Sequence, residues 1–86
     1  MEYFVYILQS LKDNKYYIGC TSDIDSRLAF HNRGLQRSTK NRIPFKLIYS
    51  EALSDKSAAL KREKQIKSYK GGNSFKKIIR WGVVPP

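Results

Sequence analysis

The sequence contains a single cysteine, Cys20, among 86 residues. An intramolecular disulfide is therefore impossible, and zinc sites built from paired cysteines are excluded. No apolar stretch approaches the roughly 20 residues that a membrane-spanning helix needs. The apolar run at residues 4–8 is also too short for the core of a signal peptide. These absences predict a protein of the reducing cytoplasm that has no contact with a membrane.

Motifs of several enzyme classes are missing as well. There is no P-loop, no GxGxxG turn, and no Ser, His and Asp arrangement typical of nucleophilic hydrolases. Repeats, linkers and low-complexity segments are absent too. Hydrophobic residues make up 41% of the chain and aromatic residues 13%, which is enough for a globular fold. The composition therefore predicts one small domain over residues 1–86.

Acidic side chains are scarce in the second part of the chain. Residues 33–86 contain fourteen Lys and Arg but three Asp and Glu, whereas residues 1–32 contain three basic and four acidic side chains. The formal net charge of +10 therefore belongs entirely to the second part. Such asymmetry favours a polyanionic partner, and nucleic acid is the commonest one. On charge alone, a solvated surface or an acidic protein partner remains open.

Hydrophobic patterning predicts three strands and three helices. The order β-β-α-β-α-α is typical of an α+β domain, here a small three-stranded antiparallel sheet flanked by helices. We expect strands over residues 3–9, 15–20 and 45–51, helices over 23–33, 55–69 and 74–81, and a long basic loop over 34–44.

Local signals indicate where elements begin and which side chains face inward. A variant capping box at residues 22–25 starts the first helix, and Gly34 ends it. Alternation in the third strand predicts that Phe45, Leu47 and Tyr49 share one face. The apolar stripe expected on the second helix consists of Ala58, Ala59, Leu60, Ile66 and Tyr69.

Glu63 lies inside that apolar stripe, and it is the only carboxylate after Asp55. A carboxylate on an inward face is costly unless it is paired or bound to a cation. A structural ion pair with a nearby Lys or Arg explains the position, and so does a metal site. One carboxylate with several waters suits Mg²⁺, which keeps much of its hydration shell, and does not suit zinc.

Four further side chains are candidates for chemistry. Arg27 and His31 share one border of the first helix at i and i+4. Tyr6 and Tyr17 lie in the predicted hairpin, which would bring their hydroxyls to one end of the sheet. By pattern alone, strand tyrosines more often pack in the core, and an exposed Arg or a lone His is ordinary. Cys20 has no evident activating partner, so we expect a structural thiol.

Taken in order, these residues resemble the GIY-YIG endonuclease superfamily, and in particular its small stand-alone bacterial members. Residues 4–6, Phe-Val-Tyr, stand where the family has Gly-Ile-Tyr, and residues 17–19 match Tyr-Ile-Gly. Residues 31–34 resemble the family's His-x-x-Gly, and residues 58–67 resemble the helix with its metal-binding glutamate. The resemblance covers about residues 3–80. The chain departs from the family at Phe4, where the motif has glycine, and at Cys20, where some relatives have lysine.

The resemblance implies a metal-dependent endonuclease that hydrolyses phosphodiester bonds in DNA, directed by structure rather than sequence, in repair or recombination. Tyr6, Tyr17, Arg27 and His31 would be its catalytic residues, and Glu63 would hold Mg²⁺ or Mn²⁺. A tyrosinate, or a tyrosine assisted by His31, would take the proton of the attacking water. Arg27 would stabilise the transition state.

We expect nucleic acid as the partner, with DNA favoured, and a protein partner for targeting is compatible with the small size. Contacts would go to phosphates, with little base specificity. A nucleic-acid-binding module with little activity of its own is the main alternative, and a protein-interaction domain is another. The cations expected at phosphates are Arg37, Lys40, Arg42, Lys61, Arg62, Lys67, Lys76 and Lys77.

Overall fold

The computed structural model of the protein describes residues 2–81 and has the predicted order of strands and helices. The α+β class and the three-stranded antiparallel sheet are confirmed. None of the helices in this described range is long and apolar enough to span a membrane. The strands are β1 (Tyr3–Ser10), β2 (Tyr16–Thr21) and β3 (Phe45–Leu53), and the helices are α1 (Ile24–Asn32), α2 (Lys56–Ser68) and α3 (Asn73–Trp81).

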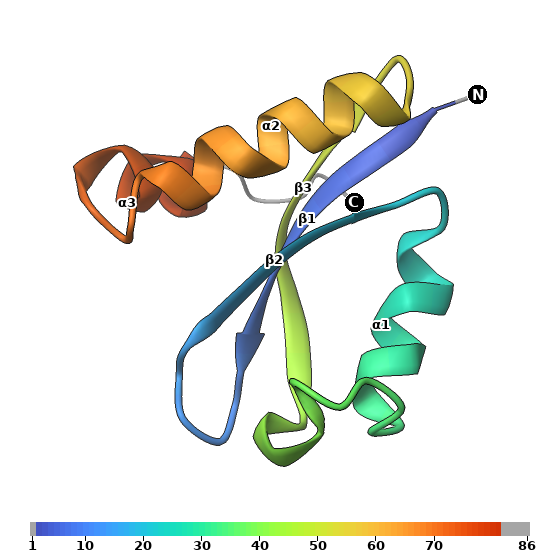
Figure 1. Ribbon diagram of the computed structural model, residues 1–86. Coiled ribbons are helices and arrows are strands. Elements are labelled where there is room, and N and C mark those ends of the chain that lie inside the picture. The colour runs from blue at the N-terminus through green and yellow to red at the C-terminus, as the bar shows by residue number, and fades with distance from the viewer. Residues whose placement is uncertain (1, 82–86) are drawn as a thin grey trace.

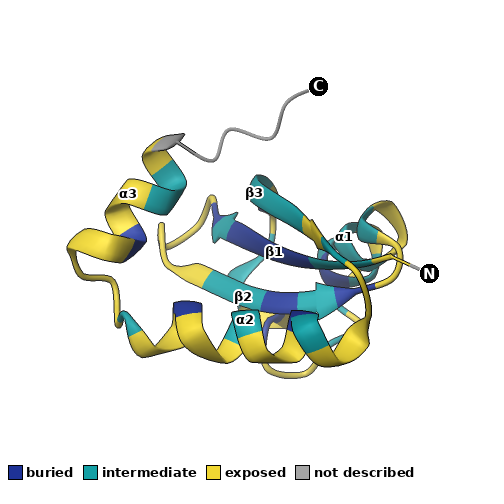
Figure 2. Ribbon diagram, turned by 90° about the horizontal axis from the view of Figure 1, so that it is seen from above, coloured by how far each residue is buried: buried dark blue, intermediate teal, exposed yellow. Residues whose placement is uncertain are grey.

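The sheet has the order β2-β1-β3, so β1 is central and β2 and β3 are edge strands. The helix α1 covers one face, and α2 and α3 cover the other (Figure 1). The four residues from Val5 to Leu8 are all buried because both faces of β1 are covered (Figure 2). Successive side chains point to opposite faces, so Val5 and Ile7 face α2 and α3 while Tyr6 and Leu8 face α1.

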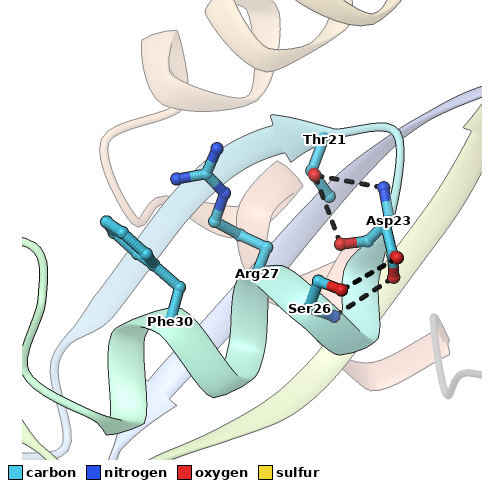
Figure 3. A pocket seen from close by; sticks show the side chains of 5 residues that line it. All are labelled: Thr21, Asp23, Ser26, Arg27 and Phe30. Carbon is cyan, nitrogen blue, oxygen red and sulfur yellow. Dashed lines mark hydrogen bonds between the residues drawn. The ribbon is translucent and has the colours of Figure 1, made fainter.

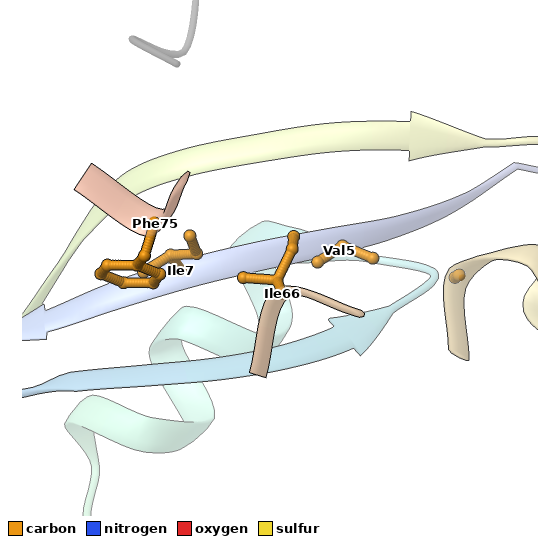
Figure 4. Packing of buried hydrophobic residues seen from close by; sticks show 5 residues of the cluster. Val5, Ile7, Ile66 and Phe75 are labelled. Carbon is orange, nitrogen blue, oxygen red and sulfur yellow. The ribbon is translucent and has the colours of Figure 1, made fainter. Parts of the chain in front are cut away.

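The apolar core lies between β1 and the helices α2 and α3. Val5 and Ile7 from the strand pack with Ala59, Ile66 and Phe75 from the helices, and each of these five is at most 3% exposed (Figure 4). In α2, Ala59 and Ile66 stand at i and i+7, with position 63 on the same face between them. The core therefore fixes the face of α2 that meets the sheet, and this places Glu63 against the sheet.

The strand β3 carries a β-bulge at Ile48. Ile7 pairs with Tyr49, and the next residue, Leu8, pairs with Leu47, so one residue of β3 is left without a partner of its own. An inserted residue of this kind reverses the alternation on one side of the bulge.

Because of the bulge, the prediction that Phe45, Leu47 and Tyr49 share a face is wrong. Tyr49 packs against the core below α2, whereas the Phe45 ring lies on the α1 side, with its centroid 5.9 Å from that of His31. The alternation of residues along one strand does not reveal a bulge, because a bulge is defined by how that strand pairs with its neighbour, here β1.

The ends of the first helix differ slightly from the predicted ones. Asp23, rather than Ser22, is the N-cap of α1, and its carboxylate accepts a hydrogen bond from the backbone N–H of Ser26 at 3.1 Å. Gly34 has φ +73°, as expected of a left-handed residue just after a helix. At the second helix, which we expect to begin at residue 55, Asp55 is the N-cap. Part of the predicted loop is also regular, since Lys40–Arg42 form a turn of 3₁₀ helix.

The prediction that Leu60 belongs to the buried stripe of α2 is wrong, because its side chain is 48% exposed. The residues that face the sheet recur at i, i+4 and i+7 from Ala59, and Leu60 lies about 100° around the helix from that line. An apolar residue next to the stripe is therefore indistinguishable by type from one inside it.

We predict that Ile66→Ala lowers the free energy of unfolding by about 3 kcal/mol, because it leaves a cavity under α2. The matched control is Leu60→Ala in the same helix, which should change stability by less than about 0.5 kcal/mol at its exposed site. Chemical denaturation of the three proteins measures both values. Equal losses for the two variants would contradict the placement of the core.

Candidate active site

Tyr6, His31 and Thr39 form a buried chain of hydrogen bonds between β1, α1 and the segment after α1. The Tyr6 hydroxyl lies 3.1 Å from His31 Nε2, and His31 Nδ1 lies 3.0 Å from Thr39 Oγ1. The residues are 3%, 0% and 0% exposed, respectively. Three polar side chains are thus sealed in the layer between α1 and the sheet, and each has a partner there.

His31 is the one fully buried residue of α1. The sequence places it at the border of an apolar stripe formed by Ile24 and Leu28, but both of those residues are half-buried. Burial, and then the charge of Arg27, lowers the pKa of His31. A lowered pKa favours the neutral imidazole, so at neutral pH the ring can accept a proton.

Burial raises the pKa of the Tyr6 hydroxyl, and the negative charge of Glu63 and the neighbouring Tyr17 act in the same direction, while Arg27 opposes them. The phenol is therefore protonated at neutral pH. A preformed tyrosinate therefore does not fit this environment.

Tyr17 lies beside Tyr6 and is more exposed. Its ring stacks on that of Tyr6 with centroids 6.2 Å apart, and its hydroxyl accepts a hydrogen bond from Gln36 Nε2 at 3.1 Å. Gln36 and Thr39 both belong to the segment after α1, which the sequence presents as a basic loop. Sequence reasoning assigned neither residue to the site, and a single polar residue in such a loop carries no signal of burial.

Gly19 of β2 stands directly opposite Tyr6 in the register. A Cβ atom at this position would lie 2.7 Å from the Tyr6 hydroxyl oxygen and 3.1 Å from the Tyr17 ring. Separations under 3.0 Å force atoms to move. Glycine is therefore required for the Tyr6 side chain to cross the edge strand and reach His31.

Arg27 projects from α1 into a hollow of about 230 Å³ beside the end of β2 (Figure 3). Its guanidinium carbon lies 5.0 Å from the centroid of the Phe30 ring. Both carboxylate oxygens of Asp23 are engaged by Ser26, and no acidic group within residues 2–81 forms an ion pair with Arg27. The guanidinium is thus positioned to receive an anion from solution.

Glu63 reaches the site from α2, on the other side of the sheet. Its side chain is 17% exposed, and Lys67 Nζ pairs with it at 2.6 Å. The Cys20 thiol of β2 lies against the same carboxylate. Arg27 and Glu63 both act electrostatically on the Tyr6 hydroxyl. Because β2 is an edge strand, groups from both faces can meet over it.

Within residues 2–81 no three His, Cys, Asp or Glu side chains come together as a metal cluster. The donor set at Glu63 is one carboxylate, so a bound ion there would complete its coordination with water. This fits Mg²⁺, which usually binds one or two carboxylates and keeps several waters, and does not fit zinc.

Three of the cations expected at phosphates are engaged within the chain. Arg62 Nε contacts both Glu51 oxygens at 3.0 and 3.1 Å, and Arg42 pairs with Asp13 at 3.2 Å. Lys67 pairs with Glu63, as described above. The other five are exposed: Arg37, Lys40, Lys61, Lys76 and Lys77.

The basic face of α3 extends one turn beyond the predicted residues. Lys76 and Lys77 line a shallow hollow of about 330 Å³ together with Asn73 and Arg80. The cations that we expect at phosphates from the sequence do not include Arg80. Its spacing of three and four residues from the two lysines is the signal that could have included it.

A comparison with models of protein families matches residues 2–76 to the GIY-YIG catalytic domain. The chain belongs to the GIY-YIG family. This membership implies nuclease activity in general, with a nucleic acid as substrate, and GIY-YIG nucleases generally depend on a divalent metal ion.

Relatives of this GIY-YIG protein are of similar size. A UPF0213 protein of Staphylococcus haemolyticus is 40% identical over 78 residues, which are 90% of this chain and 94% of the relative. UPF0213 proteins of Staphylococcus aureus are 44% identical over 68 residues, or 78% and 82% of the two chains. The solution NMR structure of a UPF0213 protein from Bacillus halodurans is similar, with a TM-score of 0.59 and 31% identity, over 95% of this chain and 87% of that one.

We predict that Cys20 alkylates about tenfold or more slowly at pH 8 than a free thiol, because burial and the Glu63 carboxylate raise its pKa to about 11. At pH 8 the thiol is then almost wholly protonated. Glu63→Gln removes one of the two causes, so it should lower the pKa and speed alkylation.

The rate follows from the mass of this single-cysteine protein after timed exposure to iodoacetamide. Glu2→Gln, which removes an exposed carboxylate elsewhere, is the control and should react like the unmodified protein. Alkylation of Glu63→Gln at the original rate would show that Glu63 does not act on Cys20.

Proposed function

We propose that this GIY-YIG protein is a metal-dependent endonuclease that hydrolyses phosphodiester bonds in DNA, directed by structure rather than by sequence, in repair or recombination. The observation that carries the proposal is the hydrogen bond between the buried Tyr6 hydroxyl and His31 Nε2. It supplies a proton acceptor beside a free guanidinium and a half-buried carboxylate.

In this proposal Tyr6 and His31 act together as the general base. The Tyr6 hydroxyl donates its proton to His31 Nε2 while the phenol oxygen receives a proton from the attacking water. The two transfers balance, so the high pKa of Tyr6 is no obstacle and no free tyrosinate accumulates. The hydroxide equivalent then attacks phosphorus, and the bond to the leaving 3′ oxygen breaks.

Arg27 is the group that binds the scissile phosphate. Its guanidinium is held over Phe30 at the mouth of the hollow, so little reorganisation is needed when negative charge develops on the phosphoryl oxygens. Preorganised positive charge of this kind stabilises the transition state more than the ground state. Tyr17, whose ring stacks on that of Tyr6, can donate its hydroxyl proton to the same oxygens.

Glu63 would hold the divalent ion, Mg²⁺ or Mn²⁺. When bound, the ion supplies positive charge that stabilises the leaving 3′ oxygen. The carboxylate must exchange its ion pair with Lys67 for the metal, and Lys67 is more than half exposed, so its ammonium can turn to solvent. Water solvates the ammonium once it turns away, and this offsets part of the ion pair that the carboxylate gives up.

The exposed cations support binding to nucleic acid through phosphates. Lys76, Lys77 and Arg80 recur along one face of α3, and Lys61 lies exposed on α2. Lysine and arginine contacts of this kind attract the backbone of any sequence. Selection of substrates would then rest on the shape of the DNA, as in branched or distorted duplexes.

The second candidate is a nucleic-acid-binding module with little activity of its own. The observation in its favour is the pairing of Glu63 with Lys67, which occupies the carboxylate that a metal needs. The two candidates differ in what the loss of Glu63 removes: cleavage in the first, and nothing in the second.

We predict that cleavage of DNA in Mg²⁺ or Mn²⁺ falls about 100-fold or more in Glu63→Gln and in Tyr6→Phe, each of which removes one participant in the reaction. Duplex, flap, fork, bubble and single-stranded substrates, each with an EDTA control, form the assay. Glu2→Gln, an exposed carboxylate outside the site, should cleave like the wild type.

Metal-dependent cleavage that persists undiminished in Glu63→Gln would contradict the assignment of that residue. No cleavage of any substrate by the wild type, together with salt-sensitive DNA binding in both proteins, would establish the binding module instead.

We also predict that Lys76→Ala with Lys77→Ala weakens DNA binding and flattens its salt dependence. For every phosphate that is no longer neutralised by a lysine, the slope of log affinity against log salt should fall by about 0.9. Fluorescence anisotropy from low to moderate salt measures the slope. The control pair, Lys12→Ala with Lys15→Ala in the turn between β1 and β2, should leave the slope unchanged, and an equal effect of both pairs would contradict a role for the α3 face.

A further inference from the structure

We propose that Thr39 is a positioning residue that fixes the tautomer of His31, so that Nδ1 carries the ring proton and Nε2 faces Tyr6 as a proton acceptor. The catalytic consequence rests on the proposed function, but the tautomer is a property of the protein alone. Neither the family membership nor the relatives' names assign a role to Thr39.

The placement of hydrogens along the buried chain leads to this tautomer. Thr39 Oγ1 has the backbone carbonyl oxygen of Gln36 at 3.4 Å as an acceptor for its own proton. The Thr39 oxygen then accepts from His31 Nδ1–H at 3.0 Å, and His31 Nε2 accepts from the Tyr6 hydroxyl at 3.1 Å. Each of the three hydrogens has an acceptor, as buried polar groups require.

The opposite tautomer leaves a hydrogen unsatisfied. With the ring proton on Nε2, the imidazole donates to the Tyr6 oxygen and Thr39 donates to Nδ1. The Tyr6 hydroxyl hydrogen then has no acceptor among the hydrogen bonds of residues 2–81, although Tyr6 is only 3% exposed. A buried donor without a partner is disfavoured, so the network itself selects Nδ1–H.

The surroundings of His31 give this choice a chemical consequence. The rings of Tyr6, Tyr17, Phe30 and Phe45 lie around the imidazole, with centroids 4.7 to 6.1 Å away. The charged group that acts on it is the Arg27 cation, and no carboxylate among the described residues contacts the ring. Thr39 Oγ1 is therefore the group that stabilises Nδ1–H when His31 becomes an imidazolium.

Thr39 thus performs, with a neutral hydroxyl, the orienting task that a carboxylate performs in other histidine-based proton acceptors. Its position is secured by the same short segment, since the Thr39 backbone N–H also donates to the Gln36 carbonyl oxygen at 3.1 Å. The Gln36 side chain meanwhile holds the Tyr17 hydroxyl. The segment after α1 therefore sets the geometry of both motif tyrosines.

The direct test is the ¹⁵N NMR spectrum of His31, which is the only histidine in the chain and needs no assignment by mutation. In the free wild-type protein at neutral pH we expect a pyrrole-type shift at Nδ1 and a pyridine-type shift at Nε2. A protonated Nε2 in the wild type would overturn the proposal, whatever the protein's activity.

Two variants connect the tautomer to catalysis. Thr39→Val keeps the shape but removes the hydroxyl, so the Nε2–H tautomer should become populated and kcat should fall about tenfold or more, as for a lost hydrogen bond to a charged group. The acid limb of the pH–rate profile should also move to lower pH, because the imidazolium loses a stabilising acceptor. Thr39→Ser restores the hydroxyl and should recover the tautomer, the rate and the profile.

Thermal unfolding of each variant separates loss of folding from loss of positioning. If Thr39→Val does not fold, Thr39→Ala replaces it, and the wild-type spectrum remains decisive. A folded variant without the hydroxyl that keeps the Nδ1–H tautomer and the wild-type profile would overturn the proposal. A wild type with the predicted tautomer but no cleavage of any substrate would contradict the proposed function and leave the tautomer assignment standing.

Discussion

The hydrogen bond between the Tyr6 hydroxyl and His31 Nε2 is the interaction on which the site depends. It joins the central strand to α1 across the layer between that helix and the sheet, where both side chains are buried. Several separate features serve it: the missing side chain at Gly19 lets the phenol cross the edge strand, and Thr39 holds the far side of the imidazole. Burial raises the pKa of the phenol and lowers that of the imidazole, so it favours a protonated Tyr6 and a neutral His31.

The two faces of the sheet differ in what they carry. One face of β1 forms the apolar core with α2 and α3, and the other face holds the polar chain below α1. Glu63 lies on the first face, but its charge raises the pKa of Tyr6, whose side chain lies on the second face. We relate this effect to the position of β2, which is an edge strand and pairs with β1 through Gly19 and Tyr6. A central strand in that place would have buried the carboxylate among apolar groups at a high desolvation cost.

Sequence reasoning succeeded where the signal was local and failed where it depended on pairing. The strands, the Asp55 cap and Gly34 follow from residue type and spacing, and the structure has them. The prediction that Phe45 and Tyr49 share a face was wrong because the bulge between them arises from the pairing of two strands, which the sequence of one strand does not show. The predicted burial of Leu60 was wrong because the orientation of the docked helix decides which border of its apolar stripe is covered. The charge of Arg62 is visible in the sequence and predicts a place at phosphates. The bifurcated hydrogen bond from its Nε–H to both oxygens of Glu51, which lies in another element, is not visible there.

The sequence by itself determined the order of the elements, the basic second half, and the residue types that carry the family resemblance. These depend on propensity, periodicity and charge, which are properties of short segments. The tertiary structure alone decided that His31 is fully buried, that Thr39 and Gln36 belong to the site, and that Gly19 stands opposite Tyr6. Residues 25 positions apart, such as Tyr6 and His31, become partners only when packing brings their elements together. The environment that sets their protonation is created by that packing.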